Sequence, residues 1–450
     1  MSLSKLLVGE YQNRIFVLIS SLVIVSLVID LLISNLSRAI NIATSWSIGS
    51  FIIITVVYIT GQYFILRYVR GKSKSIRNRS ALITRLDRVV TLTQYIIMVL
   101  PIAVILQILT SSNYSTGLLT WGVPISYVLS TAIIGILAAR FFRWYQSNKN
   151  FIVLLYALAS VAVAIRVAIT GLFYVPLLFI APSSRNAQSE VAFQPFEPTS
   201  VLQSLNDAYV TSSSIAFMLM WIATAALLRN YYQKTTNIKY WIIVAIIPAY
   251  AISDYFISDE IIAQSIGFDT ASYELFITFQ GVGAGVLISV PFWFMSAGVG
   301  RRSRQVRNYM TITAIGIILF FIASSVTIDH APYPPFGFLL ILSIGLSSYL
   351  MLVGLYSSAV SVSSDSDLRR YMKTTAANQS KLLDSIALGE VLQQIENQVK
   401  EKSDQISDET GVEPTLDENE VKDYMEQVLR EVEKSKVHEK RENSSSDDIP

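Results

Sequence analysis

The hydrophobic pattern of the chain consists of long apolar runs separated by short polar segments. Ten of these runs reach the roughly 20 mostly apolar residues that a membrane-spanning helix needs. The pattern therefore predicts an all-α, polytopic helical membrane bundle of about ten transmembrane helices, with the lipid bilayer as its surroundings. The predicted spans are Ile15–Ser34, Ile48–Leu66, Val89–Thr110, Gly117–Ala139, Phe151–Val175, Asp207–Leu228, Tyr240–Ile257, Ser272–Val299, Tyr309–Ile328 and Phe336–Val360.

The pattern changes abruptly after Val360, so we predict a membrane bundle over residues 1–360 and an acidic cytoplasmic tail over residues 361–450. The tail contains 12 Lys or Arg and 21 Asp or Glu. Apolar residues at helical spacing predict two amphipathic helices, at about 366–402 and 415–436, and a disordered end. Neither helix is long enough to form a core alone, so each must pack on the other, on a second copy or on a cytoplasmic partner.

Composition agrees with a membrane protein, since 52% of the residues are hydrophobic and only 15% are charged. The chain has no cysteine and two histidines, which argues against disulfides, thiolate chemistry and imidazole metal sites. We find no phosphate-binding glycine loop, no H-E-x-x-H motif and no serine with a plausible histidine partner. The sequence therefore predicts no enzyme activity, no cofactor, no metal site and no nucleic-acid partner.

The basic residues between the spans predict the orientation in the cell membrane, because Lys and Arg in short loops stay on the cytoplasmic side. Eight of them follow the second predicted span, between Arg67 and Arg88, and the later loops of the same parity are also basic. Both termini are therefore predicted to be cytoplasmic. The Arg67–Arg88 loop either only fixes this topology or also binds anionic lipid headgroups.

Ionisable residues inside spans are costly and are candidates for function. At about 1.5 Å of helix rise per residue, Asp30 and Arg166 lie about 22 Å and Asp254 about 21 Å from the cytoplasmic ends of their spans. Gln107 and Gln280 lie slightly further out, and Asp207 lies at the outer rim. These six residues are the candidate ligand or ion pocket, with Arg166 facing one or both aspartates. Alternatively, the charges form a structural ion pair, or Arg166 snorkels toward the outer headgroups.

A smaller pattern concerns helix packing. Gly281 and Gly285 form a G-x-x-x-G motif in the eighth predicted span, which favours close contact with another helix over contact with a ligand.

The alternation of apolar hairpins with basic and aromatic turns, from about Gly117 to Val360, resembles the multi-span membrane regions of some sensor histidine kinases. The tail segments "KLLDSIALGE", "ETGVEP" and "VKDYMEQVLREV" are similar to the tails of uncharacterised multi-pass proteins of ammonia-oxidising archaea. No kinase module is visible after Val360, and no catalytic residue is carried over. The resemblance implies a membrane protein that receives a signal or acts as a scaffold.

Three functions remain open from the sequence. In the first, the bundle binds a ligand or ion from the outer side and the tail recruits a cytoplasmic partner, as in a sensor, receptor or scaffold. In the second, the layer of Asp30, Arg166 and Asp254 serves a secondary transporter or ion-coupled permease. In the third, the chain is a structural subunit of a membrane complex. The tail favours the first, because two amphipathic helices suit interaction better than transport.

Overall fold

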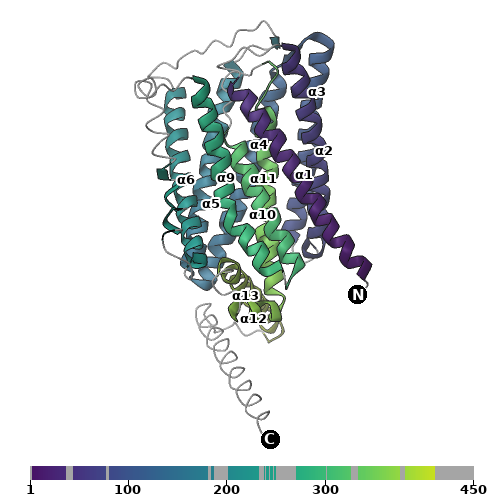
Figure 1. The fold of residues 1–450 in the computed structure, drawn as a ribbon. Coiled ribbons are helices and arrows are strands. Elements are labelled where there is room, and N and C mark those ends of the chain that lie inside the picture. The colour runs from purple at the N-terminus through teal and green to yellow at the C-terminus, as the bar shows by residue number, and fades with distance from the viewer. Residues whose placement is uncertain are drawn as a thin grey trace. The chain divides into compact units, whose positions relative to one another are not determined.

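The structure is a computed structural model of the full chain. It describes residues 3–36, 44–77, 81–180, 184–186, 201–232, 270–300, 302–325, 333–374 and 381–410, with scattered helical positions between 238 and 249 (Figure 1). The predicted span Tyr240–Ile257, which includes Asp254, and the predicted tail helix at 415–436 lie wholly or largely outside the described residues.

The described part of the chain is an all-α bundle, as the apolar runs predict, and nine of its helices are long and apolar enough to cross a membrane. Two three-residue strands form a short antiparallel ladder in which Tyr114 pairs with Arg185. The elements are α1 (Leu3–Leu36), α2 (Thr44–Arg77), α3 (Ala81–Ser111), β1 (Asn113–Ser115), α4 (Gly117–Asn148), α5 (Phe151–Ile180), β2 (Ser184–Asn186), α6 (Val201–Tyr232), α9 (Thr270–Gly300), α10 (Arg304–Ala323), α11 (Phe338–Ser363), α12 (Ser366–Thr374) and α13 (Lys381–Thr410).

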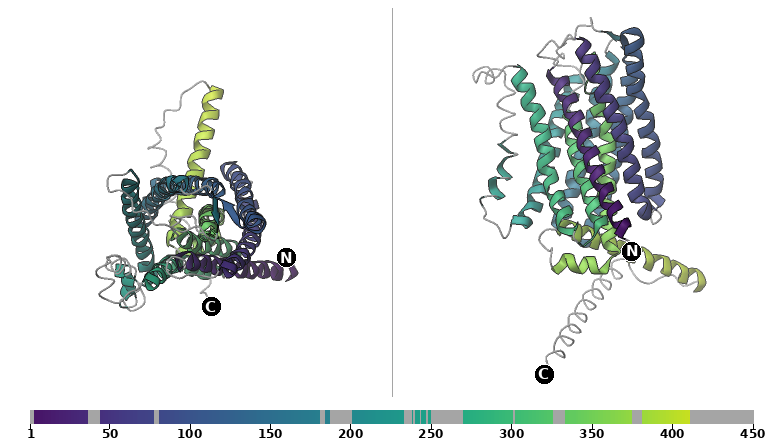
Figure 2. Two further views of the ribbon diagram at one scale, coloured as in Figure 1. Left: turned by 90° about the horizontal axis from the view of Figure 1, so that it is seen from above. Right: turned by 45° about the vertical axis from the view of Figure 1, so that its right-hand side comes forward.

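Seven of these helices form a ring around the other two spans (Figure 2). Each of α1, α2, α3, α4, α5 and α6 contacts the next, and α9 contacts both α6 and α1. The hairpin of α10 and α11 fills the centre, and we call it the central hairpin. We call the end at which α11 begins the outer end, because the basic loops predict that it faces away from the cytoplasm, and the opposite end the inner end.

The central hairpin is buried on all sides by the other spans. The apolar windows of α10 and α11 are 94% and 100% buried, against 33–56% for the ring helices. Serines in α11 are tolerated because they bond within the helix, as Ser343 Oγ does to the Leu340 carbonyl at 2.7 Å and Ser347 Oγ to the Ile344 carbonyl at 2.8 Å.

Glycines bring the central helices close together. A Cβ atom at Gly354 of α11 would lie 2.7 Å from the Tyr309 carbonyl of α10, and one at Gly316 of α10 would lie 2.9 Å from the Met351 nitrogen of α11. The G-x-x-x-G motif acts in the same way, because a Cβ at Gly285 would lie 2.9 Å from Phe321 Cβ. The prediction that this motif packs helices is confirmed.

The compact unit that contains the bundle extends beyond the predicted boundary at Val360. It ends at Gly389, and residues 390–450 form a second unit. The helix predicted at 366–402 is observed as two helices, α12 and α13. The first compact unit therefore includes about thirty residues beyond the change in composition at Val360. The physical reason is burial: Leu368, Met372, Leu383 and Ile386 are at most 2% exposed within the first unit.

Candidate functional site at the outer end of the central hairpin

Asp30 of α1 caps the outer end of α11. Its carboxylate is fully buried, and Oδ2 accepts a hydrogen bond from the Gly337 backbone N–H at 3.1 Å. Gly337 is the N-cap of α11 and adopts a φ of 85°, in the left-handed region that favours glycine. A carboxylate at this position satisfies a free N–H of the first helical turn and is stabilised by the positive end of the helix dipole.

Arg166 of α5 caps the outer end of α10, the other helix of the central hairpin. Its Nη2 donates to the backbone carbonyl of Ser324, the C-cap of α10, at 3.1 Å, and its Nε donates to Ser213 Oγ of α6 at 3.1 Å. The side chain is half-buried. A cation suits a helix C-terminus for the same reason that an anion suits an N-terminus.

Asp30 and Arg166 therefore act at the same end of the bundle, as the depth calculation predicts, but they do not bind one another. Each carries the charge that complements one end of the hairpin, the carboxylate at the start of α11 and the guanidinium at the end of α10. Of the alternatives that the sequence leaves open, an Asp30–Arg166 ion pair is not observed, because helix ends with unpaired N–H and C=O groups satisfy the two charges separately. Asp254, the other possible partner of Arg166, lies outside the described residues. We refer to these two interactions as the outer clamp.

The other predicted site residues have separate surroundings. Gln107 Oε1 accepts from the Ser115 backbone N–H at 2.9 Å and so holds the turn after α3. Asp207 is exposed and accepts from Gln203 one helical turn away. Gln280 is half-buried in α9, next to the packing motif, and Asp254 lies outside the described residues. Among the described members of the six, none has another member as a hydrogen-bond or ion-pair partner.

Further contacts hold residues 333–336, which precede α11, at the outer end. The ring of Tyr333 stacks on that of Tyr114 from β1, with centroids 6.2 Å apart. Phe336 meets Phe51 of α2 edge to face, and its carbonyl accepts from Ser34 Oγ of α1 at 3.4 Å. The start of α11 is thus attached to α1, to α2 and to β1, which follows α3.

A line of buried polar side chains runs from Asp30 toward the inner end, and we call it the polar seam. On α2 the seam consists of Thr55, Tyr58 and Gln62, and on α3 it includes Thr91 and Gln94. The residues of each helix are three or four positions apart, so they share one helix face. Gln62 Nε2 donates to Gln94 Oε1 at 2.5 Å, and the Gln94 amide lies against Gly345 of α11. Within the described residues, six buried atoms of the seam have no hydrogen-bond partner: Asp30 Oδ1, Thr55 Oγ1, Tyr58 Oη, Gln62 Oε1, Thr91 Oγ1 and Gln94 Nε2.

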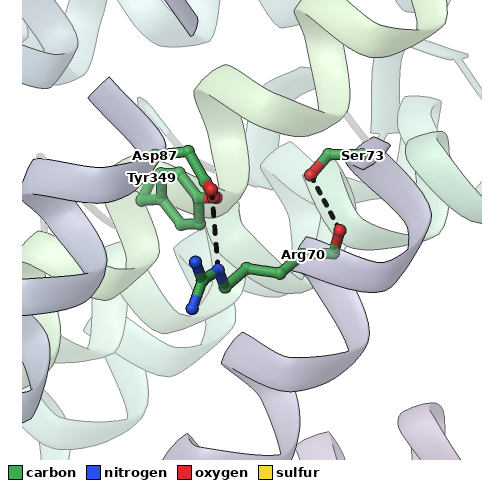
Figure 3. A network of polar contacts seen from close by, with 4 residues as sticks. All are labelled: Arg70, Ser73, Asp87 and Tyr349. Atoms are coloured by element: carbon green, nitrogen blue, oxygen red, sulfur yellow. Dashed lines mark hydrogen bonds and ion pairs between the residues drawn. The ribbon is translucent and has the colours of Figure 1, made fainter. Parts of the chain in front are cut away.

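The polar seam ends at Asp87, which Figure 3 shows between three helices. This carboxylate of α3 is 3% exposed, and it accepts a hydrogen bond from the Tyr349 hydroxyl of α11. The Arg70 guanidinium of α2 completes the group, with Nε 3.5 Å from Asp87 Oδ2. Because the Arg70 side chain is 37% exposed, this charged group connects the buried interior to the inner surface.

The start of α13 is docked on the turn between α4 and α5 at the inner end. Asn148 Nδ2 donates to the Ser385 carbonyl at 2.9 Å, and Asn150 Nδ2 donates to Ser385 Oγ at 2.8 Å. A Cβ at Gly389 would lie 3.0 Å from Cα of the buried Trp144. Residues 381–389 therefore use their apolar face within this chain, rather than leaving it free for a partner.

A cavity of about 910 Å³ lies between α3 and α4. Its lining is mainly apolar, and Trp121 and Val128 at its edge are 72% and 69% exposed. Three hydroxyl-bearing residues gather at the outer end of the cavity: Ser115, Thr116 and Thr120. The cavity is separate from the outer clamp.

Sequence reasoning identified Asp30 and Arg166 but missed Asp87, Tyr58 and the Gln62–Gln94 pair. Asp87 stands between Arg85 and Arg88, so its sequence context indicates a basic loop rather than a buried site. The signal for the seam was present as polar residues on one face of two apolar spans, since Tyr58 and Gln62 are four positions apart and Asp87, Thr91 and Gln94 repeat at helical spacing.

The comparisons with known proteins give no match. No protein-family model, no curated protein and no solved structure matches the chain.

Proposed function

We propose that the protein is a sensor-like membrane protein in which the central hairpin transmits a change at the outer end to the docked residues 381–389. The observation that carries this proposal is the continuity of α11. The helix starts at the outer clamp, is surrounded by other spans along its length, and is separated from α12 by only Ser364 and Asp365. A shift of α11 along its axis is therefore a shift of α12.

The charges of the outer clamp suit a role in detection. The capping bonds of Asp30 and Arg166 come from ring helices α1 and α5, so a ligand or ion that moves either ring helix changes the support of the hairpin. A fully buried carboxylate such as that of Asp30 is costly in a membrane protein, and a functional role accounts for that cost.

The tail gives the proposed readout at the inner end. Residues 381–389 are held by two asparagine side chains and by close contact with Trp144, which is a small surface that a displacement of α12 can release. In this proposal, the inner end faces the cytoplasm and the released segment recruits a cytoplasmic protein or a second copy of the chain. Both termini are cytoplasmic in this arrangement.

Hydrogen exchange of the full-length protein in detergent micelles tests this proposal. Asp30→Asn is expected to weaken the cap of α11 and to speed exchange of the backbone amides of residues 381–389, while amides of α4 stay protected. Asp207→Asn removes a charge at the same end without touching the hairpin and serves as the control. Unchanged exchange at residues 381–389 in a folded Asp30→Asn protein would refute the transmission mechanism.

The polar seam favours a second candidate function, an ion-coupled permease in which protons move between Asp30 and Asp87. Steps of three or four residues along α2 and α3 correspond to about 4.5–6 Å, a gap that ordered water can bridge between unpartnered polar atoms. Proton uptake into reconstituted vesicles tests it. The permease requires that Gln62→Leu abolishes uptake while the exposed variant Tyr63→Leu does not; absence of uptake in the unmodified protein excludes it.

A further inference from the structure

A second cavity, of about 390 Å³, lies between α1 and α2 near their inner ends. Its size falls in the range of small-molecule sites, about 300–1,000 Å³. One part of the lining is apolar, and the other is polar or cationic. The apolar part is formed by Ile15, Phe16, Ile19, Phe64 and Ile65, and the polar part by Gln12, Arg67, Tyr68, Gly71 and Lys72.

The two cations of this cavity have no acidic partner among the described residues. Arg67 is exposed and Lys72 is half-buried. The neighbouring Arg70 differs, because it is paired with Asp87. Arg67 and Lys72 lie beside the apolar part of the cavity. They create a positive potential that favours an anion with apolar groups of its own.

Aromatic residues shape the polar part of the cavity. Lys72 Nζ lies 5.4 Å from the centre of the Tyr68 ring, which is within the range of a cation–π interaction. The same residue also contacts α1: its ring stacks on Phe16 at 4.2 Å, and its hydroxyl donates to Asn13 Oδ1 at 3.1 Å. Tyr68 thus connects α1 to α2 and fixes the position of the lysine.

We propose that this cavity binds an anionic glycerophospholipid, with the phosphate between Arg67 and Lys72 and an acyl chain against Ile15, Ile19 and Phe64. The cations follow the apolar part of α2, at the level where headgroups meet the hydrocarbon core. Gly71 keeps the cavity open, since no atom lies within 4 Å of where its Cβ would be. Arg67 and Lys72, two of the eight basic residues between Arg67 and Arg88, thereby bind lipid in addition to setting topology.

Lipid binding to the full-length protein in detergent tests this site, by native mass spectrometry with phosphatidylglycerol, phosphatidylcholine or inorganic phosphate added. We expect phosphatidylglycerol to bind preferentially. Neutralising one cation, as in Arg67→Gln or Lys72→Gln, is expected to weaken binding about fivefold, and both together about thirtyfold. Gly71→Leu fills the cavity without changing charge and is expected to abolish binding.

The control is Arg143→Gln, an exposed cation at the same end but outside the cavity, which should leave binding unchanged. The thermal midpoint of each lipid-free variant shows whether it is folded. Three results would each overturn the proposal: equal binding of phosphatidylcholine, unchanged binding in folded Gly71→Leu, or full displacement of the lipid by inorganic phosphate, which would indicate a site for free anions.

Discussion

Asp30 and Gly337 are 307 positions apart in the sequence and form a helix cap between two different helices, with 3.1 Å between the carboxylate oxygen and the backbone nitrogen. Caps usually come from the residue that precedes the helix. Here that residue is a glycine without a side chain, so α1 supplies the acceptor. The first span is thereby fastened to the start of the last one.

Replacing Asp30 tests the cap. In Asp30→Ala the buried Gly337 N–H loses its acceptor, so we expect the free energy of unfolding to fall by about 1–3 kcal/mol. Asp30→Asn keeps a carbonyl oxygen and should lose less. Unfolding in mixed micelles measures both variants, with exposed Asp207→Asn as the control. Wild-type stability of Asp30→Ala would contradict the assignment.

Arg166→Ala removes the donors to the Ser324 carbonyl and to Ser213. We expect the free energy of unfolding to fall by about 1–3 kcal/mol, because the C-cap carbonyl of α10 loses a charged donor. Ser213→Ala removes only one acceptor, and its effect should be smaller. An arginine that merely snorkels toward water would give no loss in either variant.

The double variant Asp30→Ala, Arg166→Ala distinguishes the outer clamp from a direct ion pair. Two charges that bind separate helix ends should give additive losses, within about 0.5 kcal/mol. The same unfolding measurement applies. A larger coupling, of the size expected for residues in contact, would restore the ion pair that the sequence suggested.

The close approach of α10 and α11 predicts a strong effect at Gly354. A Cβ there would lie 2.7 Å from the Tyr309 carbonyl and 2.8 Å from the Thr313 nitrogen, both of them backbone atoms. Gly354→Val should therefore separate the central helices and cost more than about 3 kcal/mol, seen as loss of the monodisperse peak in size exclusion. Gly283→Ala, with no atom within 4 Å of the new Cβ, should be neutral or stabilising.

The proposed orientation is tested by single cysteines, because the natural chain contains none. Ser204 near the outer end of α6 and Gln146 near the inner end of α4 are both exposed. With an impermeant maleimide and intact cells, Ser204→Cys should be labelled and Gln146→Cys should react only after permeabilisation. The reverse pattern would place the termini outside.

The apolar runs predicted the fold class because membrane-spanning helices are specified by local sequence. The same runs did not predict which spans are central. Burial of α10 and α11 depends on seven other helices, and its sequence signs, glycine and serine on otherwise apolar surfaces, also occur in lipid-facing spans. The sequence also does not predict which spans pack on each other when they are not neighbours in the chain, because span order does not determine adjacency. The contact of α1 with α9 is one example.

The sequence predicts the level in the bundle at which the candidate site lies, but not the groups that bind its charged side chains. Counting residues placed Asp30 and Arg166 at one level, whereas the partner of each is a backbone group at a helix end, and sequence identity carries no sign of such groups. The docking of residues 381–389 was missed for a related reason. An amphipathic face predicts that something covers it, and only the fold shows that Trp144 and the asparagines after it do.

Alkylation of Ala387→Cys in an otherwise cysteine-free chain shows whether the outer clamp controls docking of residues 381–389. Ala387 is 0% exposed, so its cysteine should react slowly in the wild-type background. With Asp30→Ala added, weakening of the docking by about 1 kcal/mol should raise the rate about fivefold, while Gln146→Cys, which is exposed, reacts equally in both backgrounds. An unchanged rate at position 387 in the folded Asp30→Ala protein would show that the outer clamp does not control this docking.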